Sequence, residues 1–184
     1  MARIRIVRHG RAAAGFGEDM DPGLDALGRS QAEAVGEQLR TIDRSLILSS
    51  PLKRAQETAA PLARHWSRTP SILHAVAEIP SPRGMSLEGR VVWLRQLMAG
   101  SWRDVPPELA QWREACIAAV AGLKEDAVIF SHYVAINVLM GAAVSDDKVV
   151  VFSPANCSVT VFDNAGGKLM LIDKGSEASL TKVN

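Results

Sequence analysis

The chain has 184 residues, of which 47% are hydrophobic and 22% charged, and its formal net charge is +1. A chain of this length suits one domain and buries about 70% of the surface that its unfolded form exposes. The small net charge excludes the broad basic field with which proteins attract nucleic acid or anionic lipid. Any attraction for an anion must therefore be local.

Targeting and metal-binding motifs are missing from the sequence. The opening MARIRIVRHG does not read as a signal peptide, because Arg3 and Arg5 interrupt its apolar run, and no run approaches the ~20 apolar residues of a membrane span. We therefore expect a cytoplasmic protein. Cys116 and Cys157 indicate reduced thiols rather than a disulfide framework. CxxC, HExxH, P-loop and GxGxxG motifs do not occur, so zinc and nucleotide sites lack their usual anchors.

Short apolar runs typical of β-strands alternate with helical patterns along the chain. The strand-like runs lie at residues 3–8, 46–50, 127–130, 149–152, 158–162 and 168–173. Helical patterns with one apolar face cover residues 25–41 and 51–66. This alternation predicts an α/β fold, with three layers (α/β/α) around a mostly parallel central sheet.

The segment from about residue 74 to 125 departs from this alternation. It begins with the loop EIPSPRGMS, continues with a helical pattern that contains Trp93, Trp102 and Trp112, and has two prolines at 106 and 107. We interpret it as a small helical insertion over the sheet, within a single domain of residues 1–184. Its tryptophans are expected to belong to the core rather than to a substrate platform.

Polar side chains gather at three expected strand-to-helix junctions. They are Arg8 and His9 after the first strand, Ser49, Ser50 and Arg54 after the second, and Ser131 and His132 after the third. In open α/β sheets, ligands bind outside the carboxyl ends of the strands. We therefore expect these histidines, arginines and hydroxyls to converge in one crevice.

The second junction by itself suggests an anion site. Ser50 stands at an N-cap position, Pro51 at the first helical position and Arg54 at the end of the first turn. Free backbone N–H groups, the positive end of the helix and a guanidinium would then face one crevice. This combination favours phosphate as the ligand.

The motifs RHG at 8–10, SSPLKRAQETA at 49–59 and SH at 131–132 occur in this order along the chain. Together with a glutamate between the last two, they resemble the histidine phosphatase superfamily, which has the phosphoglycerate-mutase-like fold. The resemblance implies a phosphohistidine intermediate on His9 and phosphate clamps at Arg8 and Arg54. It also implies that His132 is a further catalytic phosphate ligand and that Gly10 binds phosphate.

General chemical principles support phosphoryl transfer at these residues independently of the family resemblance. A neutral imidazole is a good nucleophile toward phosphorus, and neighbouring cations oppose its protonation. Two guanidiniums and a second, protonated histidine would stabilise the charge of the transition state in place of a metal ion. We therefore expect neither a cofactor nor a metal.

A proton donor for the leaving group must also be present. Glu78 follows the run ILHAVA, where the resemblance places this donor, and apolar surroundings would raise its pKa. The loop EIPSPRG is longer than the glutamate-to-glycine loop of many relatives, so Glu88 stays as the alternative. A capping arrangement with Ser86 would also explain a glutamate at position 88.

Two departures from the family pattern bear on function. Tyr133 follows His132 where glycine is usual, so we expect it to narrow the pocket or to change a backbone donor. Ala14 and Gly15 stand where mutases carry an asparagine, which argues against a mutase. Asn156 and Arg11 are weaker candidates near the site.

The sequence thus predicts a metal-independent phosphatase that hydrolyses a phosphomonoester, with a phosphorylated small molecule as its partner. The alternatives are a phosphohistidine protein phosphatase acting on a phosphoprotein, a mutase-type phosphotransferase and a non-catalytic phosphate-binding module. Nucleic acid and membranes are not expected as partners, and a homodimer remains open.

Overall fold

The strands form one six-stranded sheet in the order β3-β2-β4-β1-β5-β6. The protein is described by a computed structural model, in which residues 1–15 and 18–178 are placed. The strands are β1 (Ala2–Arg8), β2 (Leu46–Ser49), β3 (Ser71–Ile72), β4 (Ala127–Ser131), β5 (Val159–Ala165) and β6 (Lys168–Asp173). β1 to β4 are parallel, whereas β5 and β6 are antiparallel. The mostly parallel sheet is confirmed, with an antiparallel edge.

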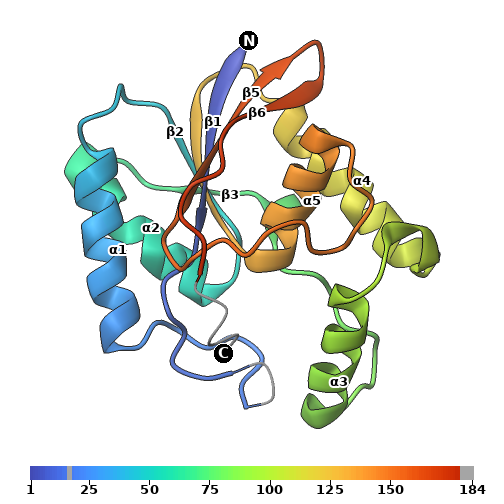
Figure 1. The fold of residues 1–184 in the computed structure, drawn as a ribbon. Coiled ribbons are helices and arrows are strands. Elements are labelled where there is room, and N and C mark those ends of the chain that lie inside the picture. Colours follow the sequence, from blue (N-terminus) through green and yellow to red (C-terminus); the bar gives the residue numbers. More distant parts are fainter. Residues whose placement is uncertain (16–17, 179–184) are drawn as a thin grey trace.

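Helices cover both faces of this sheet, which confirms the three-layer α/β/α architecture. They are α1 (Ala26–Leu39), α2 (Lys53–Trp66), α3 (Leu87–Met98), α4 (Pro107–Ala121) and α5 (Tyr133–Val144), with 3-10 turns η1 (His74–Val76) and η2 (Trp102–Asp104). In Figure 1, α1 and α2 lie on one side of the sheet, and α4 and α5 lie on the other. α3 lies at the periphery, on the side toward which β1 ends.

The apolar pattern of the strands explains the two cores. Ile4 and Ile6 of β1 pack in the larger core with α4 and α5, whereas Val7 packs in the core under α1 and α2. Successive strand residues point to opposite faces of a sheet, so β1 contributes to both. All five residues of β4 are buried, because this strand lies between β1 and β2 and is covered on both faces.

The apolar run 149–152, expected as a strand, is not one. Val149 and Phe152 are buried, but the backbone N–H groups of Val151 and Phe152 donate to Oδ1 of Asn137 in α5, at 2.7 and 3.0 Å. A side-chain amide thus takes the place of a neighbouring strand. The apolar residues serve the core and not a further strand of the sheet.

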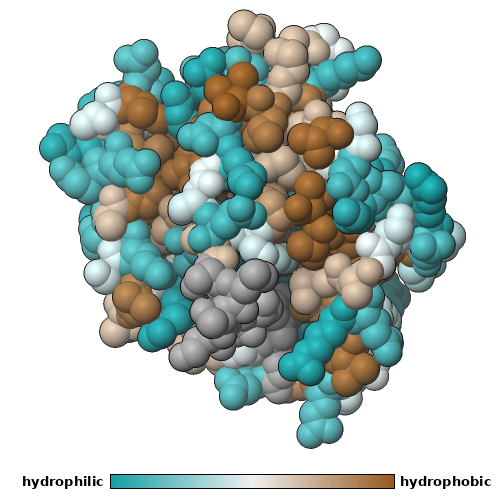
Figure 2. Space-filling model, viewed as in Figure 1, coloured by the Kyte–Doolittle hydropathy of each residue, from teal (hydrophilic) through white to brown (hydrophobic). Residues whose placement is uncertain are grey.

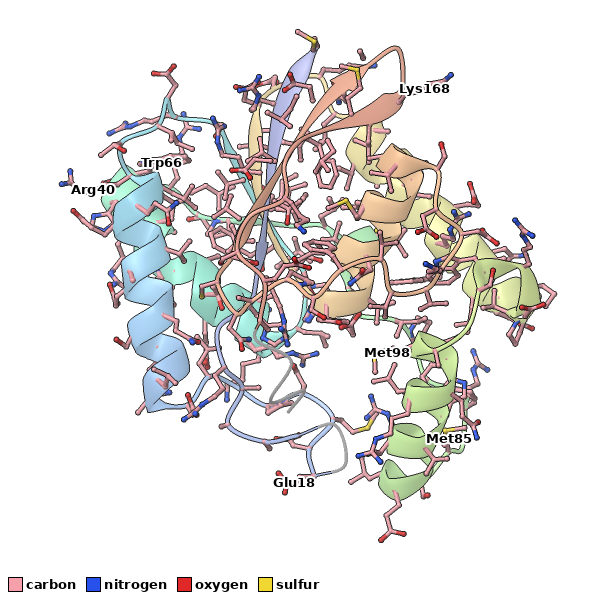
Figure 3. The ribbon with its side chains drawn as sticks, viewed as in Figure 1. Glu18, Arg40, Trp66, Met85, Met98 and Lys168 are labelled. Carbon is pink, nitrogen blue, oxygen red and sulfur yellow. The ribbon has the colours of Figure 1, made fainter. Side chains whose placement is uncertain are left out.

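Residues 74–125 form η1, α3, η2 and α4. Trp102 is buried, and Trp93 and Trp112 pack against the same core. The expectation that these tryptophans are core residues is therefore confirmed. Figure 3 places Met85, just before α3, and Met98, the last residue of α3, on the same lower side of the molecule as Glu18 of the loop between β1 and α1.

The surface and the helix lengths bear on whether a helix of this chain could span a membrane. On the face shown in Figure 2, hydrophobic residues are interrupted by hydrophilic ones. Among residues 1–15 and 18–178, no helix is long and apolar enough to cross a bilayer.

Candidate active site

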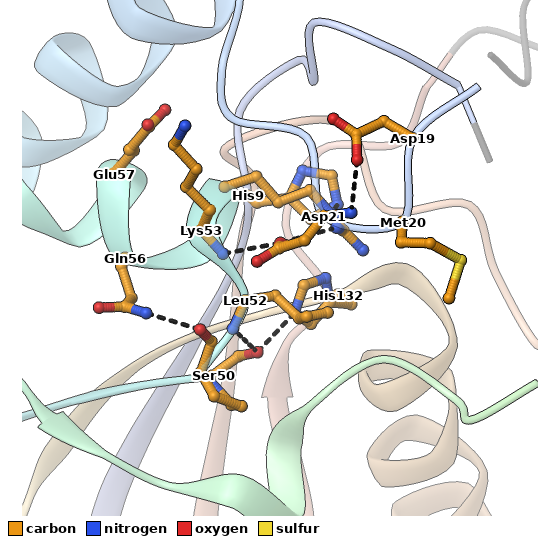
Figure 4. A network of polar contacts seen from close by, with 12 residues as sticks. His9, Asp19, Met20, Asp21, Ser50, Leu52, Lys53, Gln56, Glu57 and His132 are labelled. Carbon is orange, nitrogen blue, oxygen red and sulfur yellow. Dashed lines mark hydrogen bonds and ion pairs between the residues drawn. The ribbon is translucent and has the colours of Figure 1, made fainter.

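The three strand-to-helix junctions converge, as the sequence predicted. β4 lies between β1 and β2, so the residues that follow these strands are neighbours. Backbone hydrogen bonds continue past the strand ends, from His9 N–H to the Ser131 carbonyl (3.0 Å) and from Ser50 N–H to the Phe130 carbonyl (2.9 Å). Figure 4 shows His9, His132 and Ser50 together at this edge. The parallel sheet itself therefore assembles the site.

His9 is held in one tautomer. Its Nδ1 lies 2.7 Å from the Gly10 carbonyl, which can only accept, so Nδ1 carries the proton. The free Nε2 accepts a hydrogen bond from Nε of Arg54 at 3.2 Å. Burial first, and then Arg54 and Arg8, lower the pKa of His9 to about 3. His9 is thus a neutral imidazole with its lone pair on Nε2, as a nucleophile requires.

His132 lies beside His9, with ring centroids 5.1 Å apart. Its Nε2 is 2.7 Å from the hydroxyl of Ser50. Nδ1 of His132 is buried and has no hydrogen-bond partner among the described residues. Burial, followed by His9, Arg54 and Arg8, holds the pKa of His132 well below 6.5. Burial and these neighbours thus oppose a positive charge on the His132 imidazole, and the protonated His132 expected in the transition state stays a prediction.

The start of α2 differs from the expected one. The helix begins at Lys53 with Leu52 as its N-cap residue, so Ser50 is not the cap and Pro51 is not the first helical residue. The hydroxyl of Ser50 accepts the Leu52 N–H (3.1 Å) and contacts His132. This hydroxyl is thus used to orient the imidazole, and the helix starts later.

Asp21, in the loop between β1 and α1, was not singled out by the sequence analysis. Its Oδ1 accepts the backbone N–H of Lys53 (2.9 Å) at the start of α2 and lies 3.8 Å from Nη1 of Arg54 (Figure 4). An N–H expected to be free for an anion is therefore bound to a carboxylate. No sequence signal distinguishes Asp21 from its neighbour Asp19, because only the folded loop brings it to α2.

Arg8 reaches the site from the end of β1. Its Nη1 donates to the Pro154 carbonyl at 2.8 Å, and its guanidinium carbon lies 5.0 Å from the centre of the Tyr133 ring. Nε of Arg8 is buried and without a hydrogen-bond partner among the described residues. Burial lowers the pKa of Arg8, and Glu78 opposes that change. Arg8 remains a cation close to His9, whose pKa it lowers.

Glu78 is buried at the same site. Oε1 accepts the backbone N–H groups of Ile79 (3.1 Å) and Val134 (3.2 Å). Burial raises the pKa of this carboxyl, while the Ile79 N–H, Arg54, the Val134 N–H and Arg8 act in the opposite direction. Glu78 can therefore hold a proton more readily than an exposed glutamate.

Glu88, the alternative acid, is exposed in the first turn of α3. The hydroxyl of Ser86 caps this helix by accepting the Gly89 N–H at 3.1 Å. A carboxylate in a first helical turn interacts favourably with the helix dipole, which explains Glu88 without catalysis. The structure brings Glu78, and not Glu88, next to the arginines.

Gly10, which is expected to bind phosphate, packs closely against Gly28 of α1. Its N–H donates to Oγ1 of Thr58 at 3.0 Å, and Oγ1 in turn donates to the Arg54 carbonyl at 2.6 Å. A Cβ at position 10 would lie 2.5 Å from the carbonyl oxygen of Gly28, so no side chain fits there. The structure thus gives Gly10 a packing role, and its contact with phosphate stays a prediction.

Two further residues support the site. Nδ2 of Asn156 donates to the His9 carbonyl at 2.9 Å, so this weaker candidate holds the histidine backbone. Arg90 of α3 is buried, donates to Oγ of Ser81 at 2.6 Å and is a further cation that lowers the pKa of Arg54. Arg11 instead pairs with Asp25 at 2.5 Å. The sequence analysis missed Arg90, because its position depends on how α3 packs.

Comparison with known proteins agrees with this geometry. The sequence profile described as histidine phosphatase superfamily (branch 1) matches residues 4–174. The uncharacterised protein Rv0525 of Mycobacterium tuberculosis is 32% identical over 146 residues, which are 71% of this chain and 72% of the relative.

Two solved structures share the fold. YhfR of Bacillus stearothermophilus superposes with a TM-score of 0.79 at 20% identity, covering 97% of this chain and 98% of the other. The mycobacterial glucosyl-3-phosphoglycerate phosphatase Rv2419c superposes with a TM-score of 0.75 at 20% identity, covering 97% and 99%. At this identity the likeness concerns the fold alone.

Proposed function

Because the chain belongs to the histidine phosphatase superfamily, we propose that it hydrolyses a phosphomonoester through a phosphohistidine on His9. The observation that carries this proposal is the state of His9. Its proton lies on Nδ1, bound to the Gly10 carbonyl, and its lone pair lies on Nε2, next to Nε of Arg54. A nucleophilic nitrogen beside a guanidinium is the arrangement that attack on a phosphoryl group needs.

The first step is transfer of the phosphoryl group. Arg54 exchanges its hydrogen bond to Nε2 for one to a phosphoryl oxygen, and the released Nε2 lone pair attacks phosphorus. The bond from phosphorus to the ester oxygen breaks, and the leaving oxygen takes the proton of the Glu78 carboxyl. Arg54 and Arg8 carry the charge that spreads over the phosphoryl oxygens. The raised pKa of Glu78 supports its role as proton donor.

The second step releases phosphate. The Glu78 carboxylate takes a proton from water, whose oxygen attacks phosphorus, and the electron pair of the Nε2–phosphorus bond returns to Nε2. The products are inorganic phosphate, free His9 and protonated Glu78, so the cycle closes. Nε2 of His132 contacts Ser50, so Nδ1, which has no hydrogen-bond partner among the described residues, is the ring nitrogen left to contact a phosphoryl oxygen.

The presence of a proton donor at Glu78 bears on which class of phosphate ester the protein would hydrolyse. A buried proton donor is needed for a poor leaving group such as an alkoxide, and is dispensable for a phosphohistidine or a p-nitrophenyl ester. The burial of Glu78 therefore favours an alkyl phosphomonoester of a small molecule over a phosphohistidine protein.

The experiment is hydrolysis of p-nitrophenyl phosphate and of a panel of phosphorylated metabolites with EDTA present, with His9→Ala as the blank. We expect turnover by the wild type and none by the variant. After a rapid acid-free quench with labelled substrate, the wild type should carry label on His9. Absence of turnover by the wild type, or equal turnover by His9→Ala, contradicts the proposal. Turnover of a phosphohistidine protein alone would identify the alternative function.

A further inference from the structure

The aromatic side chain that follows His132 lies against the guanidinium of Arg8. The Arg8 guanidinium carbon is 5.0 Å from the centre of the Tyr133 ring, within the ~6 Å over which a ring face attracts a cation. A second contact, from Nη1 of Arg8 to the Pro154 carbonyl at 2.8 Å, holds the same head group from another side. The ring and the carbonyl together define where the guanidinium lies.

The ring of Tyr133 is fixed in turn. Its hydroxyl lies 3.0 Å from the hydroxyl of Ser153, the residue before Pro154. The Ser153 N–H donates to Oε1 of Glu177 at 3.2 Å, which anchors this loop to the C-terminal segment. Tyr133 therefore contacts both Arg8 and the loop whose carbonyl binds Arg8. Arg8, Tyr133, Ser153 and Pro154 are thus linked to one another in a closed circuit of contacts.

A ring face suits this place better than a carboxylate would. Arg8 is half-buried with its Nε fully buried, and a guanidinium in such a place needs a partner that replaces its lost hydration. A carboxylate would do so by neutralising the charge, and it would then compete with a phosphoryl group for Arg8. The quadrupole of a tyrosine ring attracts the cation and leaves its charge available to an anion.

We propose that Tyr133 is a positioning residue that holds Arg8 in place for a phosphoryl group, through its ring and through its hydroxyl contact with Ser153. The proposal rests on the proposed function, in which Arg8 contacts the substrate. It also explains why a tyrosine occupies a position at which glycine is the usual residue, because here the side chain holds Arg8.

The test compares Tyr133→Leu, Tyr133→Phe and Val144→Ala for binding of inorganic phosphate by calorimetry and for kcat and KM with p-nitrophenyl phosphate. Val144 lies at the far, exposed end of α5 and serves as the matched control. We expect Tyr133→Leu to weaken phosphate binding about three- to thirtyfold. Tyr133→Phe keeps the ring and should recover most of this loss, and Val144→Ala should bind as the wild type does.

A double-mutant cycle separates positioning from a purely structural role. In an Arg8→Ala background, Tyr133→Leu should cause no further loss of phosphate affinity, because the group it positions is absent. An undiminished loss in that background, or wild-type affinity of Tyr133→Leu, overturns the proposal. Unfolding curves recorded alongside show whether each variant is folded. If Tyr133→Leu is not folded, the same cycle is run with Tyr133→Phe, whose smaller loss of affinity, caused by the missing contact with Ser153, should likewise vanish in the Arg8→Ala background.

Failure of this proposal can be told apart from failure of the proposed function. If the wild type binds phosphate with the expected dependence on Arg8 and Tyr133 but shows no turnover, the proposed hydrolase function fails and the positioning role of Tyr133 stands. If the wild type turns over substrate and Tyr133→Leu has the same kcat, KM and phosphate affinity, only the positioning role of Tyr133 fails. A wild type that binds no phosphate overturns both.

Discussion

Nε of Arg54 donates a hydrogen bond to Nε2 of His9 at 3.2 Å, although the two residues are 45 positions apart in the chain. The contact joins the first residue after β1 to the first turn of α2. It holds the His9 lone pair beside a cation and disfavours its protonation. One guanidinium therefore orients the nucleophile, keeps it neutral and is placed to bind the group that it attacks.

Arg54→Ala should abolish most activity while the protein stays folded. Loss of one group that stabilises the transition state costs about 10²- to 10³-fold in kcat. Arg54→Lys should recover little, because a lysine cannot donate in the planar geometry of a guanidinium. Steady-state kinetics with p-nitrophenyl phosphate, together with far-UV circular dichroism, check this. A variant with more than a tenth of the wild-type kcat would contradict it.

The pH profile should depend on Glu78. Because burial raises the pKa of this carboxyl, its protonated form persists above the ordinary range of a glutamate and is lost as the pH rises further. We expect kcat with an alkyl phosphate to fall on the alkaline side, and Glu78→Gln to lower it by about 10²- to 10⁴-fold and to remove this alkaline decline.

With p-nitrophenyl phosphate, whose leaving group needs little protonation, Glu78→Gln should lose much less activity. Glu88→Gln is the matched control, since Glu88 is exposed, and it should behave as the wild type with both substrates. Equal losses of Glu78→Gln on the two substrates would argue against a proton donor at this position.

The buried histidines should make the protein sensitive to acid. The pKa of His9 is about 3 in the folded protein and near 6.5 when unfolded, so the unfolded chain binds more protons between these values. The free energy of unfolding therefore falls as pH drops from 6.5, by up to about 1.4 kcal/mol per pH unit for this group. Above pH 6.5 this dependence vanishes. His132 acts in the same direction.

Urea unfolding of the wild type and of His9→Gln between pH 4 and 8 measures this contribution. Glu78 acts in the opposite direction, since its raised pKa makes the folded state bind the additional proton, but it is present in both proteins. Below pH 6.5 the free energy of unfolding should change less steeply with pH in His9→Gln than in the wild type, and above pH 6.5 the two proteins should have the same slope. Identical slopes below pH 6.5 would show that His9 is not buried as a neutral group.

Asn137→Ala should destabilise the fold. Oδ1 of this buried residue accepts the N–H groups of Val151 and Phe152, which would both lose their partner. A buried unsatisfied N–H costs about 1–3 kcal/mol, so we expect a loss of about 2–4 kcal/mol in the free energy of unfolding. Val144→Ala, on the exposed end of the same helix, is the control and should change stability little. Thermal unfolding of the two variants checks the difference.

The sequence by itself determined the strand-to-helix alternation and which three junctions meet at the candidate site. RHG, SSPLKRAQETA and SH each follow an apolar run, and parallel strands bring their carboxyl ends together at one edge. The apolar pattern and the order of the motifs are local properties, which a sequence displays directly. The prediction of a strand at residues 149–152 was wrong because a local apolar pattern cannot show that the backbone of this run donates to Asn137.

Only the tertiary structure decided which side chains share the site and in what state. It brought Asp21 to the start of α2, left Glu88 exposed, bound the Gly10 amide to Thr58 and set the ring of Tyr133 against Arg8. It also buried His132 beside two arginines, which together lower the pKa of this imidazole. Contacts between distant segments and the loss of water around a charge arise when the chain packs, so no local pattern reveals them.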